Sequence, residues 1–333
     1  MSTFFMFGAE DKLKGNKLMK LRELIDWSAF RKRLLGIHKN DIDPQGGQKP
    51  YDHLKMLKTV LLKEWHSLSD KDMEEVLRVR IDFMAFTGFD LAEDMPDEAT
   101  ICRFRNALSK KGLDKVIFGE INRQLEKHGF KLEKATGAVI DATLIESSAR
   151  PKRIIEVEKD WEETGDRIDI QESSDPDARW LKKGNKSYFG YKGFAVADTE
   201  GYIQDVSVES ANAPEVSKLE GMLPSIKAET LYADKGYASE DNRKLLKDKF
   251  KDGIMHKAAR NRPLTDGQKE ANKLISKVRY IIEQDFGTLK RRFDFTRASY
   301  MTKQKVETQF RLKAICLNLL KAVNRMTLQE CLS

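Results

Sequence analysis

Apolar residues recur at helical spacing through most of residues 17–135. The clearest runs are Leu54, Leu57, Val60 and Leu61 and, further along, Met73, Val76, Leu77 and Val79. Spacings of three and four residues place such side chains on one face of a helix. Ser69 followed by Asp72 has the pattern of a capping box, which marks a helix start. The N-terminal part of the chain is therefore predicted to be entirely helical.

A further helix start is predicted at Pro96-Asp97. The helix that follows would present the basic residues Arg103, Arg105 and Lys110. Residues 97–129 have the pattern of two helices joined near Lys111-Gly112. Such a pair is either a DNA-binding helix-turn-helix or an ordinary helical hairpin, and the sequence pattern leaves both open.

From Gly137 onward the pattern changes to that of strands. Residues 138–145 form an apolar, β-branched run of the length of a buried strand. Strands 188–198 and 203–209, separated by Thr199-Glu200-Gly201, are predicted to form an antiparallel hairpin. The later elements are predicted as helix 213–223, strand 230–234, helix 239–249, strand 253–257 and helix 266–292. This order predicts an α/β fold, a mixed sheet flanked by helices, preceded by an all-α N-terminal domain.

Residues 151–180 interrupt this alternation. They contain five Lys and Arg against ten Asp and Glu, and Ser173-Ser174-Asp175-Pro176 is typical of a turn. A segment this acidic, with almost no apolar periodicity, buries too little apolar surface to join a core. We expect an exposed acidic connector that is partly helical or mobile.

The net positive charge is concentrated in the C-terminal part of the chain. The 333 residues hold 60 Lys and Arg against 53 Asp and Glu, a net charge of +7, but residues 241–333 alone hold 22 against 10, a net +12. A basic C-terminal part suits a polyanionic partner. The three cysteines are widely spaced, and no uncharged run of about 18 residues exists. These features favour an intracellular protein in a reducing compartment over a disulfide-bonded or membrane-spanning one.

Three acidic residues stand where burial makes a charge costly. Asp141 lies inside the apolar run 138–145, and Asp234 ends the predicted strand 230–234, at the edge where an open α/β sheet binds ligands. Glu283 shares one face of helix 266–292 with Arg279 and Lys290, at spacings of four and seven residues. Oxygen ligands from two strands and a helix suit Mg²⁺ or Mn²⁺, and two such ions promote phosphodiester cleavage.

Each acid also has an ordinary structural interpretation. Asp141 can be a hydrogen-bonded residue of the core or of a strand end, and Asp234 can form a turn before Lys235-Gly236. Arg279 and Glu283 suit an i,i+4 surface pair. None of the five histidines has the spacing of a metal ligand, so we assign none to a metal site.

Taken together in order, these blocks resemble a known family. Val139-Ile140-Asp141-Ala142-Thr143, then Ala233-Asp234-Lys235-Gly236-Tyr237, then Arg279, Glu283 and Lys290 followed by Arg291-Arg292-Phe293, are similar to the three signature blocks of bacterial insertion-sequence transposases with a DDE triad. The group that is most similar includes the fifth-numbered insertion sequence of enteric bacteria, which is related to the fourth. The likeness extends to Trp65–Asp70 and Asp97–Ile101 in the helical region and to Lys182–Asn185 and Phe189–Lys192 in the hairpin region.

The resemblance implies a ribonuclease-H-like core with Asp141, Asp234 and Glu283 as catalytic metal ligands. It implies two Mg²⁺ ions, with Mn²⁺ as a substitute, and Arg279 and Lys290 as contacts to the terminal DNA. Further DNA contacts are predicted at the following basic residues: Lys192, Arg291, Arg292, Arg103 and Arg105.

The chain departs from the family pattern at two places. Ser276 stands where related families have a tyrosine three residues before the arginine, so an aromatic contact there is in doubt. Many relatives read Asn-x-His-Asp where this chain has Asn212-Ala213-Pro214-Glu215. That change excludes a histidine at this position but leaves Glu215 as a possible outer acid.

We therefore predict three parts: residues 1–135, a helical domain that binds DNA ends; residues 136–300, the catalytic domain with the acidic connector 151–180; and residues 301–333, a C-terminal helix that packs on the core. The predicted function is an insertion-sequence transposase that binds terminal inverted repeats, cleaves them and transfers the strands to target DNA. We expect a homodimer on double-stranded DNA, no membrane partner, and a cytoplasmic, nucleoid-associated location. Two alternatives remain open: a domesticated DNA-binding regulator without activity, and a nuclease without strand transfer.

Overall fold

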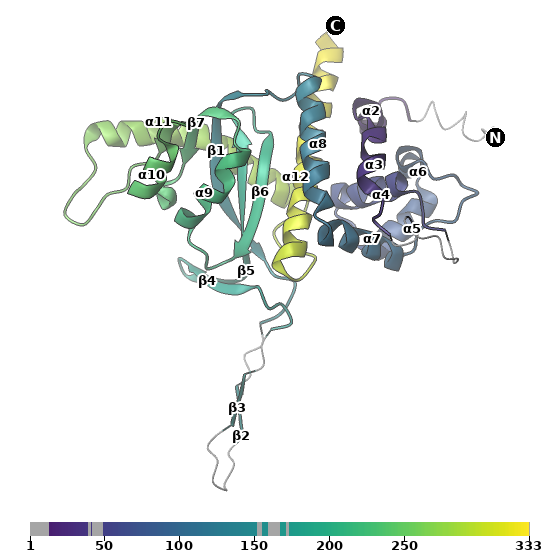
Figure 1. Cartoon of the computed structure of the whole chain (residues 1–333), viewed down its shortest axis with the longest axis horizontal. Helices are drawn as coiled ribbons and strands as arrows, with labels where there is room; N and C mark the ends of the chain where they lie inside the picture. The colour runs from purple at the N-terminus through teal and green to yellow at the C-terminus, as the bar shows by residue number, and fades with distance from the viewer. Residues whose placement is uncertain are drawn as a thin grey trace.

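The computed structural model describes residues 13–38, 41, 49–151, 155–158, 167–170 and 173–332. Its N-terminal region is helical (Figure 1). The elements in order are α2 (Lys17–Leu24), η1 (Trp27–Phe30), α3 (Arg31–Leu34), α4 (His53–His66), α5 (Asp70–Val79), α6 (Ile81–Thr87), α7 (Glu98–Lys110) and α8 (Leu113–Lys127).

The predicted helix starts are confirmed by their caps. Ser69 and Asp72 form a reciprocal capping box at the start of α5, and the Asp97 carboxylate accepts a hydrogen bond from the Thr100 amide at the start of α7. Gly112 separates α7 from α8 with a φ of 63°, a left-handed conformation that glycine adopts without strain. Helix α8 is packed against α12 (Lys303–Leu332), so its inner face is not free to enter a DNA groove.

A mixed sheet forms the second part of the fold. Its strands are β1 (Ala135–Glu146), β4 (Arg179–Lys183), β5 (Lys186–Asp198), β6 (Ile203–Ser210), β7 (Ala228–Ala233) and β8 (Lys251–Ile254). They are ordered β4-β5-β1-β7-β8, and β6 also pairs with β5. Strands β7 and β8 run parallel to β1, whereas β5 is antiparallel to it. The predicted hairpin 188–209 is therefore confirmed as β5 and β6.

Helices cover both faces of the sheet. Ala138 and Ile140 of β1 pack with Leu219 of α9 (Leu219–Met222) and Leu246 of α10 (Glu240–Leu246). Val139, whose side chain points the other way, belongs to the core formed with α11 (Asp266–Arg292) and α12. The sequence predicted one helix over 213–223, but that segment is divided into η3 (Glu215–Lys218), α9 and η4 (Leu223–Ser225), with Pro224 unable to donate within a longer helix.

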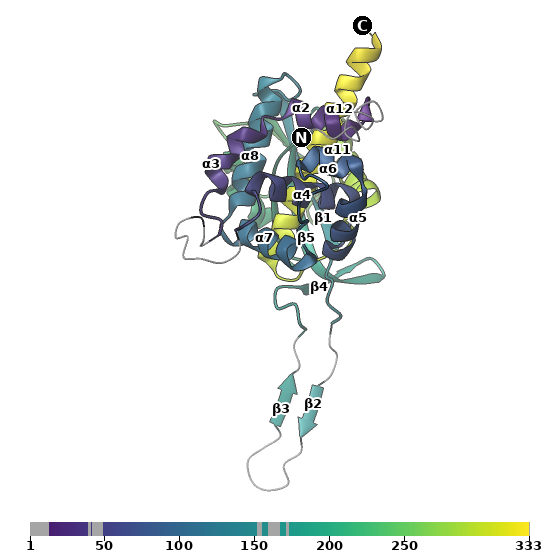
Figure 2. The same ribbon diagram turned by 90° about the vertical axis from the view of Figure 1, so that its right-hand side faces the viewer.

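The acidic connector differs from its prediction. Its described residues contain no helix; instead β2 (Ile155–Glu158) and β3 (Arg167–Ile170) pair as an antiparallel hairpin, and β4 follows. Figures 1 and 2 show this hairpin projecting away from the rest of the molecule, which agrees with a segment outside the core. Polar and apolar residues alternate in Ile155-Glu156-Val157-Glu158 and in Arg167-Ile168-Asp169-Ile170, which is the period of a strand rather than a helix.

Helix α12 lies between the helical region and the sheet (Figure 1). It contacts β6 on one side and α8 and α4 on the other, and its apolar residues belong to the same core cluster as residues of α4 and β6. Where the structure describes the chain, no helix is long and apolar enough to cross a membrane.

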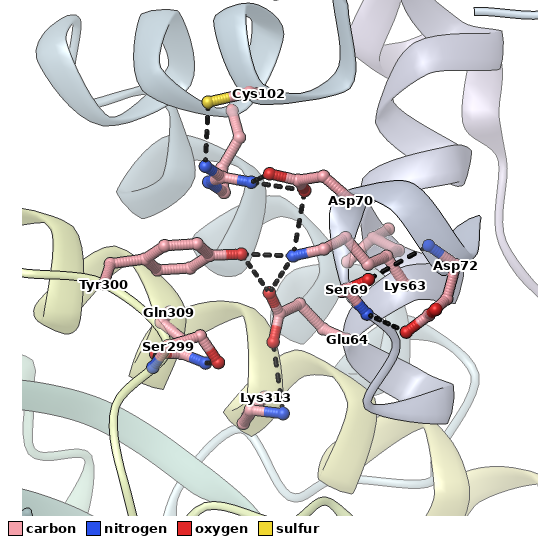
Figure 3. Close-up of polar contacts among 12 residues, drawn as sticks. Lys63, Glu64, Ser69, Asp70, Asp72, Cys102, Ser299, Tyr300, Gln309 and Lys313 are labelled. Atoms are coloured by element: carbon pink, nitrogen blue, oxygen red, sulfur yellow. Dashed lines mark hydrogen bonds and ion pairs between the residues drawn. The ribbon is translucent and has the colours of Figure 1, made fainter. Parts of the chain in front are cut away.

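A buried polar network reinforces this junction (Figure 3). Glu64 of α4 forms an ion pair with Lys313 of α12 at 3.1 Å and accepts a hydrogen bond from the Tyr300 hydroxyl at 3.3 Å. Lys63 pairs with Asp70 at 3.1 Å and donates to Tyr300. The network therefore ties the N-terminal helices to the loop that follows α11.

Candidate active site

The register of the parallel strands brings two of the predicted acids together. Ile140 of β1 is paired with Ala233 of β7, so Asp141 and Asp234 both come one position later, at the carboxyl ends of the paired segments. Asp141 has the strand parity of Val139 and therefore faces α11. The Asp141 carboxylate also accepts a hydrogen bond from the amide of Ala142 at 2.8 Å.

Helix α11 supplies the third acid and a cation that contacts all three. The Arg279 guanidinium is 2.7 Å from Asp141 Oδ2, 3.4 Å from Asp234 Oδ1 and 4.0 Å from Glu283 Oε1. The side chain of Arg279 is only 11% exposed, whereas that of Glu283 is 56% exposed. The residues predicted at separate points of the sequence thus converge on one guanidinium at the edge of the sheet.

Burial and charge act in opposite directions at this cluster. Burial raises the pKa of the Asp141 carboxyl, although Arg279 and the Ala142 amide oppose the shift. Burial also disfavours the charge of Arg279, but the neighbouring carboxylates of Asp141 and Asp234 raise the pKa of its guanidinium. Arg279 Nε is buried without a hydrogen-bond partner in the described structure.

The chemistry of the cluster fits a divalent cation. Three carboxylates and one guanidinium carry a formal net charge of −2, and all the donors are the hard oxygens that Mg²⁺ and Mn²⁺ prefer. Among the described residues, however, no three His, Cys, Asp or Glu side chains are grouped closely enough to form a metal site by themselves. The carboxylates are instead turned toward Arg279.

A pocket of about 440 Å³ continues from this cluster along β1. Ala142 and Thr143, which directly follow Asp141, line it together with the predicted DNA contacts Lys192 and Lys290. Lys192 is 3.4 Å from Glu215 Oε1 and donates a hydrogen bond to the Ala213 carbonyl at 2.9 Å. Burial and the nearby Lys183 lower the pKa of Lys290.

The other predicted DNA contacts differ in exposure. Arg291 and Arg292 are exposed at the end of α11, and Arg103 is exposed on α7. Arg105 is buried, and its guanidinium is 2.6 Å from the carboxylate of Asp70. Arg105 therefore supports the helical region and presents no surface to DNA.

Two residues near the acids were given little or no role from the sequence. A side chain at Gly236 would overlap the Glu215 carboxylate, so Glu215 lies directly against the turn that follows Asp234. The Tyr237 hydroxyl is buried with no hydrogen-bond partner in the described structure, and burial, with the charges of Asp141 and Glu215, raises its pKa. In the sequence, Gly236 and Tyr237 follow Asp234 within the block Ala233–Tyr237, and a glycine there permits the close approach of Glu215.

Comparison with known proteins agrees with this geometry. Residues 133–319 match the family described as Transposase DDE domain, and residues 7–107 match a transposase domain of the DUF772 family. The transposase for insertion sequence element IS1106 from Neisseria meningitidis serogroup B is 45% identical over 228 residues, which cover 68% of this chain and 78% of that protein. No solved structure matches the chain. With its ribonuclease-H-like mixed sheet and its transposase relative, the chain belongs to the DDE transposase family of insertion sequences, enzymes that cleave DNA with divalent metal ions.

Proposed function

We propose that this enzyme binds the terminal inverted repeats of an insertion sequence, cleaves the DNA there and joins the freed ends to target DNA. The observation that carries the proposal is the convergence of Asp141, Asp234 and Glu283 on Arg279, from two neighbouring strands and one helix. Three acids held beside a sheet edge have no use in a protein that only binds DNA, because they repel phosphate.

The reaction consists of two phosphodiester exchanges at the same site. In the first, water attacks the phosphorus at the end of the element, the bond to the 3′ oxygen breaks, and a 3′-hydroxyl is released. In the second, this hydroxyl attacks a phosphorus of the target, a new phosphodiester bond forms, and a 3′ oxygen of the target leaves. Neither exchange needs a covalent bond to the protein.

The three carboxylates are the residues that would hold Mg²⁺. When bound, two such ions activate the attacking oxygen and stabilise the leaving one. The protein contributes the positions of Asp141 and Asp234 through strand register and that of Glu283 through α11. Arg279 and Lys290 would neutralise phosphates on the same helix face, and Arg291, Arg292 and Arg103 are further proposed contacts. Lys192, which the sequence also predicted as a contact, already pairs with Glu215.

Partners and organisation follow from this function. We propose that residues 1–135 recognise the DNA ends and that residues 136–300 perform the chemistry. Cutting two ends of one element together requires two active sites, so we propose a homodimer on the DNA. Its place of action is the nucleoid.

The test is incubation of the purified chain with double-stranded oligonucleotides of the terminal repeats and Mg²⁺. Wild-type protein should release 3′ ends and form joined products. Asp141→Asn and Glu283→Gln should each lower cleavage by at least about 10³-fold, which corresponds to about 4 kcal/mol of transition-state stabilisation, while binding persists. Metal-dependent nicking by these variants would refute the assignment; cleavage without joining would indicate a nuclease, and binding without cleavage by wild type would indicate a regulator.

A further inference from the structure

Several separate elements line the pocket beside Asp141. Strand β1 contributes Ala142, Thr143, Leu144 and Glu146, and η3 contributes Glu215. Lys183, Lys192 and Lys290 enter from β4, β5 and α11. The hairpin of β4 and β5 brings Lys183 to a position that sequence distance from the acids does not suggest. The volume of the pocket, about 440 Å³, leaves room for a ligand group and water.

The three lysines are not equally neutralised. Lys192 is 11% exposed and shares its ammonium group between Glu215 and the Ala213 carbonyl. Neither Lys183 nor Lys290 forms an ion pair with any residue that the structure describes. Lys183 moreover contributes to lowering the pKa of Lys290, so the two positive charges are close enough to repel each other. Glu146 also lines the pocket, so its charged lining residues are three lysines and two glutamates. The formal net charge of this lining is +1, which favours an anion.

The position of the pocket indicates which anion. Lys192 is paired with Leu144 in the sheet, three residues after Asp141, which is roughly 10 Å along a strand. The backbone of duplex DNA rises about 3.4 Å per nucleotide. A DNA strand cleaved at Asp141 and running along β1 would therefore place its nearest phosphates in this pocket.

We infer that the pocket is a subsite for the backbone phosphates within about three nucleotides of the cleaved bond, with Lys183 of β4 as a contact that acts together with Lys290. The Lys192–Glu215 pair forms a wall of the subsite whose charge is already compensated. This inference rests on the proposed function, because it takes the DNA to be cleaved at Asp141. It adds the β4 hairpin to the DNA-binding surface.

The chain offers a matched control. Leu181 and Lys183 both line the pocket, whereas Lys182 between them points to the opposite side of β4 and is exposed. Lys183→Met and Lys182→Met therefore remove the same charge from adjacent positions of one strand. Equal thermal unfolding temperatures of the two variants and wild type would establish that the hairpin still folds.

The decisive measurement is the salt dependence of binding to terminal-repeat DNA without divalent metal. Lys183→Met should reduce the slope of log K against log salt by about 0.9, the value for one lost phosphate contact, and Lys182→Met should leave it unchanged. Single methylphosphonates placed one to three nucleotides from the cut should weaken wild-type binding. At one of these positions the methylphosphonate should not weaken binding by Lys183→Met, because this variant already lacks the contact between Lys183 and that phosphate.

Several results would overturn the inference. Equal slopes for the two variants, or a methylphosphonate loss that persists in Lys183→Met, would show that Lys183 touches no phosphate there. Millimolar inorganic phosphate should compete with DNA for the wild-type protein. If Lys183→Met and Lys182→Met both lose this competition to the same extent, the effect of phosphate is a general anion effect and not one of the pocket. Failure of wild type to cleave would refute the proposed function instead, and the binding measurements would still report on Lys183.

Discussion

Replacing Glu64 by glutamine removes the central charge of the network in Figure 3 while keeping the size of the side chain. Glu64 and its neighbours Lys63 and Lys313 each have side chains only 3% exposed. Removing one partner of a buried ion pair leaves the other charge desolvated, at a cost of about 3–5 kcal/mol. Lys63 keeps the carboxylate of Asp70 at 3.1 Å. Lys313 keeps the carbonyl of Phe293 at 2.7 Å and the ring of Phe295, but no carboxylate of the described residues.

The expected loss is therefore at the lower end of that range, about 3 kcal/mol at neutral pH. This is a large fraction of the 5–15 kcal/mol that is typical of a folded domain. A matched surface change, Asp241→Asn, removes a carboxylate that is 90% exposed and 3.5 Å from Lys244. It should cost well under about 1 kcal/mol.

The effect should also depend on pH. Burial opposes ionisation, but the ammonium groups of Lys313 and Lys63 hold the pKa of Glu64 below its ordinary value of 4.5. The stability that the carboxylate provides is present above pH 4.5 and is lost as the pH falls through the lowered pKa. The difference between wild type and Glu64→Gln should therefore shrink in acid.

Urea unfolding followed by tryptophan fluorescence measures both effects. Trp65 is adjacent to Glu64 and contacts Phe293 at 6.1 Å between ring centroids, so it reports on this junction. A loss below about 1 kcal/mol at pH 7, or one that stays constant as the pH falls from 7 to well below 4.5, would refute the role of Glu64 as a buried, charged link.

Three other predictions concern charged side chains elsewhere. Arg291→Ala combined with Arg292→Ala should flatten the salt slope of DNA binding by up to about 1.8, and an unchanged slope would contradict their phosphate contacts. Arg103→Met should weaken DNA binding without changing the unfolding midpoint. Arg105→Met should lower the midpoint, because it leaves the Asp70 carboxylate without its closest partner. Equal midpoints of the two variants would contradict a stabilising role of the buried Arg105–Asp70 pair. Burial, Arg80 and Arg292 lower the pKa of His66 to about 4. Because the fold favours neutral His66, the free energy of unfolding should fall by about 1–2 kcal/mol as the pH drops from 6.5 to 4, after allowance for solvent screening. His66→Asn should abolish the part of this decline that comes from His66.

Much of the architecture was readable from local sequence patterns. Apolar periodicity predicted α4 and α5, and the caps at Ser69 and Asp97 marked helix starts because they involve residues only three positions apart. The β-branched run around Ile140 predicted β1. The prediction of a partly helical connector was wrong for its described residues, because the two-residue alternation in 155–158 and 167–170 favours the strands that pair there.

The sequence proposed the members of the candidate site but not the contacts between them. Asp141 and Asp234 were predicted because charged residues in apolar strands are costly, and Glu283 because it shares a helix face with Arg279 and Lys290. The expected burial is wrong for Glu283, whose side chain is 56% exposed. The parallel register of β1 and β7 and the docking of α11 decided that all three meet at Arg279. No local pattern contains that information, since the contacts join residues up to 138 positions apart.

The exposure of the basic residues also depended on the tertiary structure and not on the local sequence. Arg103 and Arg105 differ by two positions on one helix, and the sequence offered both as DNA contacts. Only the packing of α7 decided that Arg105 is buried against Asp70 while Arg103 remains exposed. The sequence by itself determined the order and periodicity of the elements and the residue types of the candidate site, because these depend on neighbours along the chain. The tertiary structure alone decided which charges are neutralised and which, such as those of Lys183 and Lys290, form no ion pair with the described residues. Desolvation and ion pairing depend on groups that only folding brings together.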